Sequence, residues 1–468
     1  MNILLINVSL RPNSAVTLFP IGLGYVATAM KRAGFEFDLL DIDAYRYSDE
    51  EIENIISRKS YDVVCMGCIV TGYKKVKFLA NITKKYHPHA SVVVGNSVAT
   101  SIVQTLLTKT EADIAVIGEG DVTVPELLSA IEKKIPLDTV LGIAFKKDGE
   151  IFYTPPRPVI QNISELPNID FDIFDVEKYI QGTKNYVNEP LPVPREEIRS
   201  LPLNTARGCV ANCGFCYHVF KGVAYRWRSP VSLVAEIESL IKKYSLNYIS
   251  FWDELTFFSK KQTLEFVECI IESDLRFSWV ACCRADLFNQ EEDIEIIEKM
   301  KAAGCLGVGF SLESSDERIL RSMNKHITVD QFSTQTKLFH KAGLAVFTSL
   351  VLGYPEETPE TIRKTFDCCI ENKIYPSAGF LLPQPGSSMY DYAIQNGYIV
   401  DEEDYLLKMG DRQDLRINMT SMTDEEFENH VRDGLRKCNE AFGLGLKEEN
   451  LIKTQRYRPV NWQESTPK

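Results

Sequence analysis

The sequence predicts an α/β protein with a doubly wound parallel sheet over residues 1–150 and a partial (β/α)6 barrel over residues 201–395. Short strand-like runs alternate with amphipathic helical runs in both regions, which is typical of parallel sheets covered by helices. Eight prolines between residues 154 and 202 separate the two regions. Because proline fixes φ and cannot donate to a strand ladder, we expect an extended linker over 151–200. A small helical region and a polar tail follow over 396–468.

The composition narrows the class of protein. Apolar residues make up 44% and charged residues 25% of the 468, which is typical of a globular protein. The formal charge of −13 argues against nucleic acid or an anionic membrane as the main partner. No apolar run approaches the ~20 residues that span a bilayer, and no signal-peptide pattern precedes the first strand. We therefore expect a cytoplasmic protein whose twelve cysteines are core residues or metal ligands rather than disulfides.

The elements of the first region alternate without interruption. We expect strands at 3–7, 37–41, 61–67, 91–94 and 112–117, and helices at 21–33, 49–57, 74–86, 99–107 and 124–133. Ligands of such sheets bind at the carboxyl ends of the strands. Those ends are polar or rich in glycine here, and glycine lets a ligand approach the backbone closely. The run Gly22-Leu-Gly24-Tyr-Val-Ala27 formally matches the dinucleotide fingerprint, but it lies too far from the first strand to form the tight phosphate turn.

Three segments of this region resemble landmarks of the cobalamin-binding domain in B12-dependent radical SAM proteins. They are Phe19-Pro20-Ile21-Gly22-Leu23-Gly24-Tyr25, Val93-Val94-Gly95-Asn96-Ser97-Val98-Ala99-Thr100 and Ile117-Gly118-Glu119-Gly120-Asp121. The resemblance implies a Rossmann-like domain that binds cobalamin. The implied cobalamin contacts are Ser9, Pro20, Gly22, Leu23, Thr71, Gly95, Ser97, Gly118, Glu119 and Gly120. The Asp-x-His-x-x-Gly signature of methionine-synthase-like B12 domains is absent, so we expect no histidine as the lower axial ligand.

The strongest signal is the segment Cys209-Val-Ala-Asn-Cys213-Gly-Phe-Cys216. Three thiolates on one short loop can hold three corners of an iron–sulfur cube, which normally takes four cysteines. A Cys3His zinc site that includes His218 and a chance cluster of buried cysteines are the alternatives. With Phe215 before the last cysteine, the pattern resembles the C-x3-C-x-Φ-C fingerprint of radical SAM enzymes. That resemblance implies a [4Fe–4S] cluster on Cys209, Cys213 and Cys216, with S-adenosylmethionine (SAM) on the fourth iron.

The barrel elements follow the cysteine loop in order. We expect strands at 202–206, 248–252, 277–282, 307–311, 346–352 and 378–382, and helices at 230–244, 262–271, 292–303, 329–342 and 359–371. Residues at the strand ends resemble SAM-binding segments of the radical SAM family, although Trp252-Asp253-Glu254 lacks the usual glycines. The SAM contacts that the resemblance implies are Phe215, Asp253, Glu254, Arg284, Ser311, Glu313, Gly353 and Pro355.

The other cysteines carry a weaker signal. The pairs Cys65-x-x-Cys68, Cys282-Cys283 and Cys368-Cys369 are interpreted as core residues. Cys283 precedes Arg284 at the expected cavity and is a weak candidate for a hydrogen-atom donor. No other residue is assigned a catalytic role.

The resemblance implies a cobalamin-dependent radical SAM enzyme of the class B methyltransferase type. Such an enzyme would use the 5′-deoxyadenosyl radical to methylate an unactivated carbon or phosphorus centre. A B12-dependent cyclase or rearrangement enzyme is the alternative reaction, and a noncatalytic B12 or Fe–S sensor is the alternative of another class. The implied partners are a small-molecule or peptide substrate and an electron donor such as flavodoxin or ferredoxin.

Overall fold

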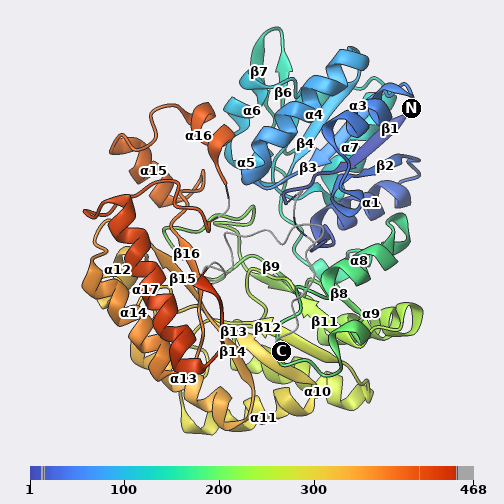
Figure 1. The fold of residues 1–468 in the computed structure, drawn as a ribbon. Coiled ribbons are helices and arrows are strands. Elements are labelled where there is room, and N and C mark those ends of the chain that lie inside the picture. The colour runs from blue at the N-terminus through green and yellow to red at the C-terminus, as the bar shows by residue number, and fades with distance from the viewer. Residues whose placement is uncertain (12–13, 15, 411, 449–450, 452–468) are drawn as a thin grey trace.

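The computed structural model describes residues 1–11, 14, 16–410, 412–448 and 451, and Figure 1 shows that the chain forms two α/β units. The N-terminal unit contains strands β1 (Ile3–Asn7), β2 (Asp38–Asp41), β3 (Val63–Gly67), β4 (Ser91–Gly95), β5 (Ile114–Val116), β6 (Ile143–Lys147) and β7 (Glu150–Tyr153). Its helices are α1 (Ile21–Arg32), α2 (Ile42–Tyr45), α3 (Asp49–Ser57), α4 (Tyr73–Tyr86), α5 (Ser97–Ser101), α6 (Val103–Lys109) and α7 (Gly120–Glu132).

The N-terminal sheet has the order β2-β1-β3-β4-β5-β6-β7. Strands β1 to β5 are parallel, which confirms the doubly wound core and places the reversal of strand order between β1 and β3. The β6–β7 hairpin is antiparallel and was not predicted, so the sheet is mixed rather than wholly parallel. Its turn is Asp148-Gly149, with positive φ at both residues, which is the geometry of a tight hairpin.

The connecting segment is more structured than an extended linker. It contains helix α8 (Val176–Thr183), whose N-cap Asp175 accepts from the backbone N–H of Lys178. The Tyr179 side chain is fully buried and its hydroxyl donates to Asp41 at the end of β2. The prediction of extended chain outside the core is wrong here because apolar side chains between the prolines pack onto the N-terminal unit.

The second unit is a partial barrel of six parallel positions. Its strands are β8 (Ser200–Leu203), β11 (Tyr248–Phe251), β12 (Ser278–Cys282), β13 (Cys305–Gly309), β14 (Ala345–Phe347), β15 (Ser349–Leu352) and β16 (Ser377–Phe380). Its helices are α9 (Pro230–Tyr244), α10 (Lys260–Ser273), α11 (Ile294–Ala302), α12 (Glu317–Ser322), α13 (Val329–Lys341) and α14 (Pro359–Glu371). The fifth predicted strand is divided at Thr348, whose hydroxyl accepts from the backbone N–H of Leu312. Strands β9 (Ala206–Arg207) and β10 (Arg226–Trp227) form a short antiparallel ladder beside the cysteine loop.

The C-terminal region packs against the last elements of the barrel. It contains α15 (Ser388–Gln395), α16 (Glu402–Lys408) and α17 (Asp424–Phe442), and α17 packs along α14. The Phe366 ring occupies the space that a side chain at Gly434 would need, so this helix pair is closely packed. The predicted tail lies mostly outside the described residues.

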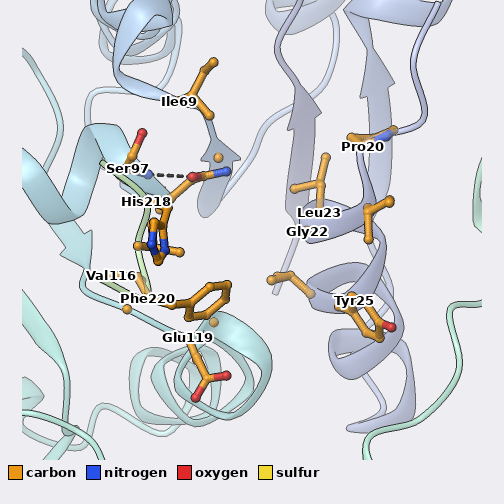
Figure 2. Close-up of a pocket in the computed structure, with 18 of the residues that line it drawn as sticks. Pro20, Gly22, Leu23, Tyr25, Ile69, Ser97, Val116, Glu119, His218 and Phe220 are labelled. Atoms are coloured by element: carbon orange, nitrogen blue, oxygen red, sulfur yellow. Dashed lines mark hydrogen bonds between the residues drawn. The ribbon is translucent and has the colours of Figure 1, made fainter. Parts of the chain in front are cut away.

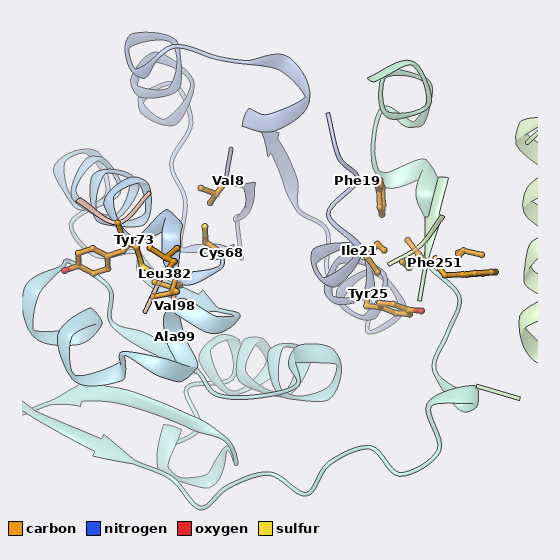
Figure 3. Packing of buried hydrophobic residues seen from close by; sticks show 14 of the residues in the cluster. Val8, Phe19, Ile21, Tyr25, Cys68, Tyr73, Val98, Ala99, Phe251 and Leu382 are labelled. Carbon is orange, nitrogen blue, oxygen red and sulfur yellow. The ribbon is translucent and has the colours of Figure 1, made fainter. Parts of the chain in front are cut away.

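One hydrophobic core runs through both units. Figure 3 shows Phe251 of β11 near Ile21 of α1, and Leu382 near Tyr73 and Val98; all belong to one cluster of buried side chains. The shared core fixes the two units relative to each other. No helix within the described part of the chain is long and apolar enough to cross a membrane.

Candidate functional site

A cavity of about 580 Å³ lies between the two units, at the carboxyl ends of the N-terminal strands. Its inner wall is apolar and comes from strands β1, β3, β4 and β5. Figure 2 shows Pro20, Gly22, Leu23 and Tyr25 from the start of α1 across the cavity from Ser97 and Val116. Its volume falls within the ~300–1,000 Å³ typical of small-molecule sites.

Nine of the ten cobalamin contacts implied by the sequence line this cavity. They are Pro20, Gly22, Leu23, Thr71, Gly95, Ser97, Gly118, Glu119 and Gly120. Ser9 is absent from the lining, because its hydroxyl donates to Asp43 and accepts from Arg46. This correction removes Ser9 from the candidate contacts.

We name the loop at residues 118–120 the corrinoid loop. Its two glycines are required for different structural reasons. Gly118 has a φ of +80°, and a Cβ there would meet no atom within 4 Å, so this position faces open space. A Cβ at Gly120 would lie 2.9 Å from Cγ2 of Val26, because α7 starts against α1. The loop therefore presents bare backbone to the cavity, as a large planar ligand requires.

Glu119 lines the cavity, but its carboxylate is already engaged. It accepts from the guanidinium groups of Arg207 and Arg226 and from the backbone N–H of Ile160. The side chain is 6% exposed. The carboxylate of Glu119 therefore holds protein groups, and the cobalamin contact of this residue stays a prediction.

The opposite wall comes from the barrel and was not predicted. Its members are Asn204, Ala206, Arg207, Tyr217, His218, Val219, Phe220, Trp252, Glu254 and Gln384. Most of them lie within a few residues of the cysteine motif. Their closeness to the motif in sequence could have identified them as lining residues. His218 projects toward the cavity (Figure 2), and its Nδ1 atom is buried without a hydrogen-bond partner in the described structure. Burial lowers the pKa of His218.

The three cysteines lie on the loop at residues 209–216, which we name the cluster loop. Backbone contacts hold this loop in place: Gly214 N–H donates to the Met323 carbonyl at 2.8 Å, and the Asn324 amide donates to the Asn212 carbonyl at 2.8 Å. The backbone N–H of Ala211 donates to Sγ of Cys209 at 3.5 Å.

The donor set fits an iron–sulfur cube better than a single metal ion. Burial, and then the neighbouring thiols Cys213 and Cys209, raise the pKa of Cys216 to about 12, so the thiolates require a bound cation. Among the described residues no group of three or more His, Cys, Asp or Glu side chains is placed to hold one metal ion. A cube needs no such group, because its cysteines bind different iron atoms.

Asp253 is a structural anchor in this fold. Its carboxylate accepts from Asn204, from the backbone N–H groups of Thr205 and Ala206, and from the Thr205 hydroxyl. Burial nevertheless raises the pKa of Asp253 to about 6. The carboxylate thus fixes the turn that leads into the cluster loop. This role corrects the expectation that Asp253 binds the SAM ammonium.

Glu254 remains available for a ligand. It lines the cavity, and its carboxylate accepts a 3.3 Å hydrogen bond from the backbone N–H of Gly208. Burial raises its pKa, since few polar groups compensate the charge. The two adjacent acids therefore separate into an anchor and a free acceptor.

Lys325 contacts or lies near three of the implied SAM contacts. It donates to Glu313 at 2.8 Å, and its ammonium lies 5.9 Å from the centre of the Phe215 ring. Arg284 donates to the Lys325 carbonyl, which ties β12 to the same segment. Glu313 has a φ of +63°, and its Oε2 is buried without a hydrogen-bond partner in the described structure. This orphaned oxygen beside the cluster loop fits a polar ligand such as SAM.

The remaining SAM contacts lie on neighbouring strand ends. Ser311 shares a 2.7 Å hydrogen bond with Ser349. Gly353 has a φ of +108°, and its N–H donates to the buried Glu357 at the start of α14. Pro355 is partly exposed in the same turn. Apart from Glu254, none of the implied SAM contacts lines the cavity of 580 Å³, so the SAM candidates form a separate set inside the barrel.

Cys283 is buried and does not line the cavity of 580 Å³. Its residue is 6% exposed, and its Sγ accepts from the amide of Gln335 at 3.5 Å. Burial, followed by the neighbouring Cys282, raises its pKa well above the ordinary value. Packing therefore accounts for Cys283, which corrects its candidacy as a hydrogen-atom donor.

Comparison with known proteins assigns both units. A model of the B12 binding domain matches residues 10–128, and a model of the Radical SAM superfamily matches residues 203–369. An uncharacterized methyltransferase of Pyrococcus horikoshii is 29% identical over 384 residues, which cover 81% of this chain and 80% of that protein. An anaerobic magnesium-protoporphyrin IX monomethyl ester cyclase of Rubrivivax gelatinosus is 26% identical over 395 residues, which cover 82% of this chain and 68% of that protein.

A solved structure shares the arrangement of the two units. It is the radical SAM methyltransferase TsrM of Kitasatospora setae with cobalamin and a [4Fe–4S] cluster bound. The TM-score is 0.65 at 19% identity, and the match covers 84% of this chain and 75% of that one. A cysteine loop at the mouth of a partial barrel, facing a glycine-lined cavity on a doubly wound sheet, agrees with both matches. The chain therefore combines a B12 binding domain with a domain of the Radical SAM superfamily, and its cofactors are cobalamin, a [4Fe–4S] cluster and SAM.

Proposed function

We propose that this enzyme transfers a methyl group to an unactivated carbon or phosphorus centre of a small-molecule or peptide substrate. The observation that carries the proposal is the cavity, which is lined by the corrinoid loop on one side and by residues flanking the cluster loop on the other. Such an arrangement brings two cofactors to one enclosed space, and proximity of this kind lowers a barrier strongly. When bound, SAM on the cluster supplies a hydrogen-abstracting radical and cobalamin supplies the methyl group.

The chain's own residues have distinct tasks in this proposal. Cys209, Cys213 and Cys216 hold the cluster, and Glu254 accepts from the ammonium of SAM. Glu313, oriented by Lys325, offers its free oxygen to the polar groups of SAM. Pro20, Leu23 and the corrinoid loop exclude water from the flat face of the cofactor.

A non-methylating reaction is the second candidate. The Rubrivivax relative is a cyclase, so a similar chain can have another outcome. The products distinguish the two reactions. Methyl transfer predicts methylated product and S-adenosylhomocysteine, whereas a cyclase predicts 5′-deoxyadenosine without S-adenosylhomocysteine.

The first test is anaerobic purification followed by assays of iron, sulfide and cobalt. We expect about four irons per chain and cobalt after reconstitution with hydroxocobalamin. Under strong reductant, SAM should yield 5′-deoxyadenosine. A wild-type protein that binds no cobalamin would refute the methyltransferase proposal, and the absence of 5′-deoxyadenosine would favour a noncatalytic sensor.

The proposal also includes an electron donor such as flavodoxin or ferredoxin, and a cytoplasmic location. All twelve cysteines are free thiols in the structure, and the cluster ligands must stay reduced.

A further inference from the structure

Four buried charged side chains join the two units beside the cavity. Glu119 and Asp121 come from the start of α7, Arg207 from β9 and Arg226 from β10. We propose that these four residues, which we name the charge lock, are positioning residues that set the distance between the corrinoid loop and the cluster loop. The inference rests on the proposed function, because it assumes that both cofactors bind.

The contacts of the charge lock are direct and multiple. Arg207 donates to Glu119 at 2.6 Å and to both oxygens of Asp121 at 2.8 and 2.9 Å. Arg226 donates to both oxygens of Glu119 at 3.0 Å. The side chains are between 6% and 10% exposed, so water does not compete for these contacts. Two positive and two negative charges balance inside the interface.

Three members of the charge lock, Glu119, Asp121 and Arg207, lie in or close to a cofactor loop. Glu119 lies between Gly118 and Gly120, and Arg207 is separated from Cys209 by one glycine with a φ of +90°. A displacement of either loop would therefore pull on a buried ion pair. The lock also reaches the connecting segment, since Arg226 donates to the Ile160 carbonyl at 2.7 Å and Glu119 accepts from the Ile160 N–H at 2.8 Å.

Aromatic rings restrict the orientation of the arginines. The guanidinium of Arg207 lies 5.1 Å from the Tyr25 ring centre and 5.8 Å from that of Phe220, and Arg226 lies 5.5 Å from Phe220. Both rings line the cavity (Figure 2). A filled cavity would thus press on the same rings that hold the arginines.

Stability alone does not account for this arrangement. Apolar side chains of similar volume often stabilise an interface as well as buried ion pairs do. Directional bonds offer a defined geometry instead, and group transfer between two bound cofactors tolerates misplacement of only about 1 Å.

The decisive experiment compares Glu119→Gln with wild type. The substitution keeps the volume but leaves two arginines facing a neutral amide. Both proteins are purified anaerobically and loaded with hydroxocobalamin, and then reduced so that the cluster and Co(II) are both paramagnetic. Pulsed EPR gives the cluster–cobalt distance, and hydrogen exchange reports on residues 118–121 and 207–209.

We expect Glu119→Gln to retain iron and cobalt but to shift or broaden the cluster–cobalt distance by about 1 Å or more. Exchange in the two segments should accelerate by about tenfold. The matched control is Glu403→Gln, which breaks another contact between the units, with Lys77 of α4, away from the cavity. It should leave the distance at its wild-type value.

Three other outcomes would count against either the charge lock or the proposed function. An unchanged distance and unchanged exchange in Glu119→Gln would overturn the charge lock while the proposed function stands. Wild-type protein that holds iron but no cobalt would instead refute the proposed function. If Glu119→Gln loses both cofactors through misfolding, Arg226→Lys, which keeps the charge, must show intermediate exchange; wild-type exchange there would overturn the lock.

Discussion

The three cysteines of the cluster loop differ from the other nine because they lie on a loop that other residues hold in place. The loop is held by backbone contacts of Gly214 and Asn212, which do not depend on the thiols. We therefore expect Cys213→Ala to fold but to lose most of its iron and its reductive cleavage of SAM. Cys269→Ala, on the outer helix α10, is the control and should keep both. Cys213→Ala protein that still holds about four irons and cleaves SAM would show that another residue is the ligand.

The neighbouring acids Asp253 and Glu254 give a second prediction, because the first anchors the fold and the second is expected to bind SAM. An alanine at position 253 would leave the N–H donors of Asn204, Thr205 and Ala206 without their acceptor, so Asp253→Ala should cost about 1–3 kcal/mol of stability. Glu254→Gln should leave the melting temperature unchanged but raise the KM for SAM in the uncoupled reaction. Thermal unfolding and 5′-deoxyadenosine release measure the two effects. A stable Asp253→Ala variant with a raised KM would return Asp253 to the SAM site.

Glu357 gives the pH dependence of the turn before α14. It is 1% exposed, and burial raises its pKa from 4.5 to about 7 although Thr361 and the Gly353 N–H donate to it. Because the folded pKa is the higher one, its contribution to stability is complete below about pH 4.5 and is lost as the pH rises through 7. Glu357→Gln should match wild type at pH 5 and exceed it at pH 8, by up to about 3 kcal/mol.

Anaerobic urea unfolding at the two pH values measures this difference. Equal unfolding midpoints for Glu357→Gln and wild type at both values would mean that the Glu357 carboxyl is charged in the folded state throughout the range.

At the scale of elements, the corrinoid loop connects β5 to α7, and its two glycines shape the wall of the cavity. Gly118 and Gly34 both have positive φ and open space around the missing Cβ. Valine therefore strains the backbone at either position, but only Gly118 lines the cavity. We expect Gly118→Val to lose bound cobalt while keeping iron and uncoupled 5′-deoxyadenosine release, and Gly34→Val to keep all three. Loss of iron together with cobalt in Gly118→Val would mean that the two units fold as one.

Elements with local signals were predictable from the sequence. Helices α9 and α14 begin and end where expected, because Ser229 and Thr358 cap them and a proline follows each cap. Helix α8 was not predicted, because its burial depends on Asp41, which is 138 residues from Tyr179.

The same distinction applies to the candidate site. Glycines and cysteines act through their own backbone or thiol, so their spacing reveals them. The sequence predicted ligand contacts for Glu119 and Asp253 but not the protein groups that their carboxylates hold. The arginines bound to Glu119 lie 88 and 107 residues away in sequence, and the donors to Asp253 lie about 48 residues away. Sequence identifies an acid at a site, but only the fold shows whether the acid is free.

At the scale of the whole molecule, the two units are joined by the buried charge lock and by α16. Helix α16 approaches the outer surface of the N-terminal unit, where Glu403 pairs with Lys77 and accepts from the Tyr73 hydroxyl. The Lys77 and Glu403 side chains are 30% and 20% exposed, whereas those of the charge lock are at most 10% exposed. Salt screens exposed charges much more strongly than buried ones.

The two junctions should therefore respond differently to ionic strength. Raising the salt concentration from about 0.05 M to about 0.5 M shortens the Debye length severalfold. We expect hydrogen exchange in α16 to accelerate, while exchange in residues 118–121 stays constant. In Glu403→Gln, α16 should already exchange fast at low salt, with little further response. Equal acceleration of both segments would show that the charge lock is open to solvent and that the two units separate as one event.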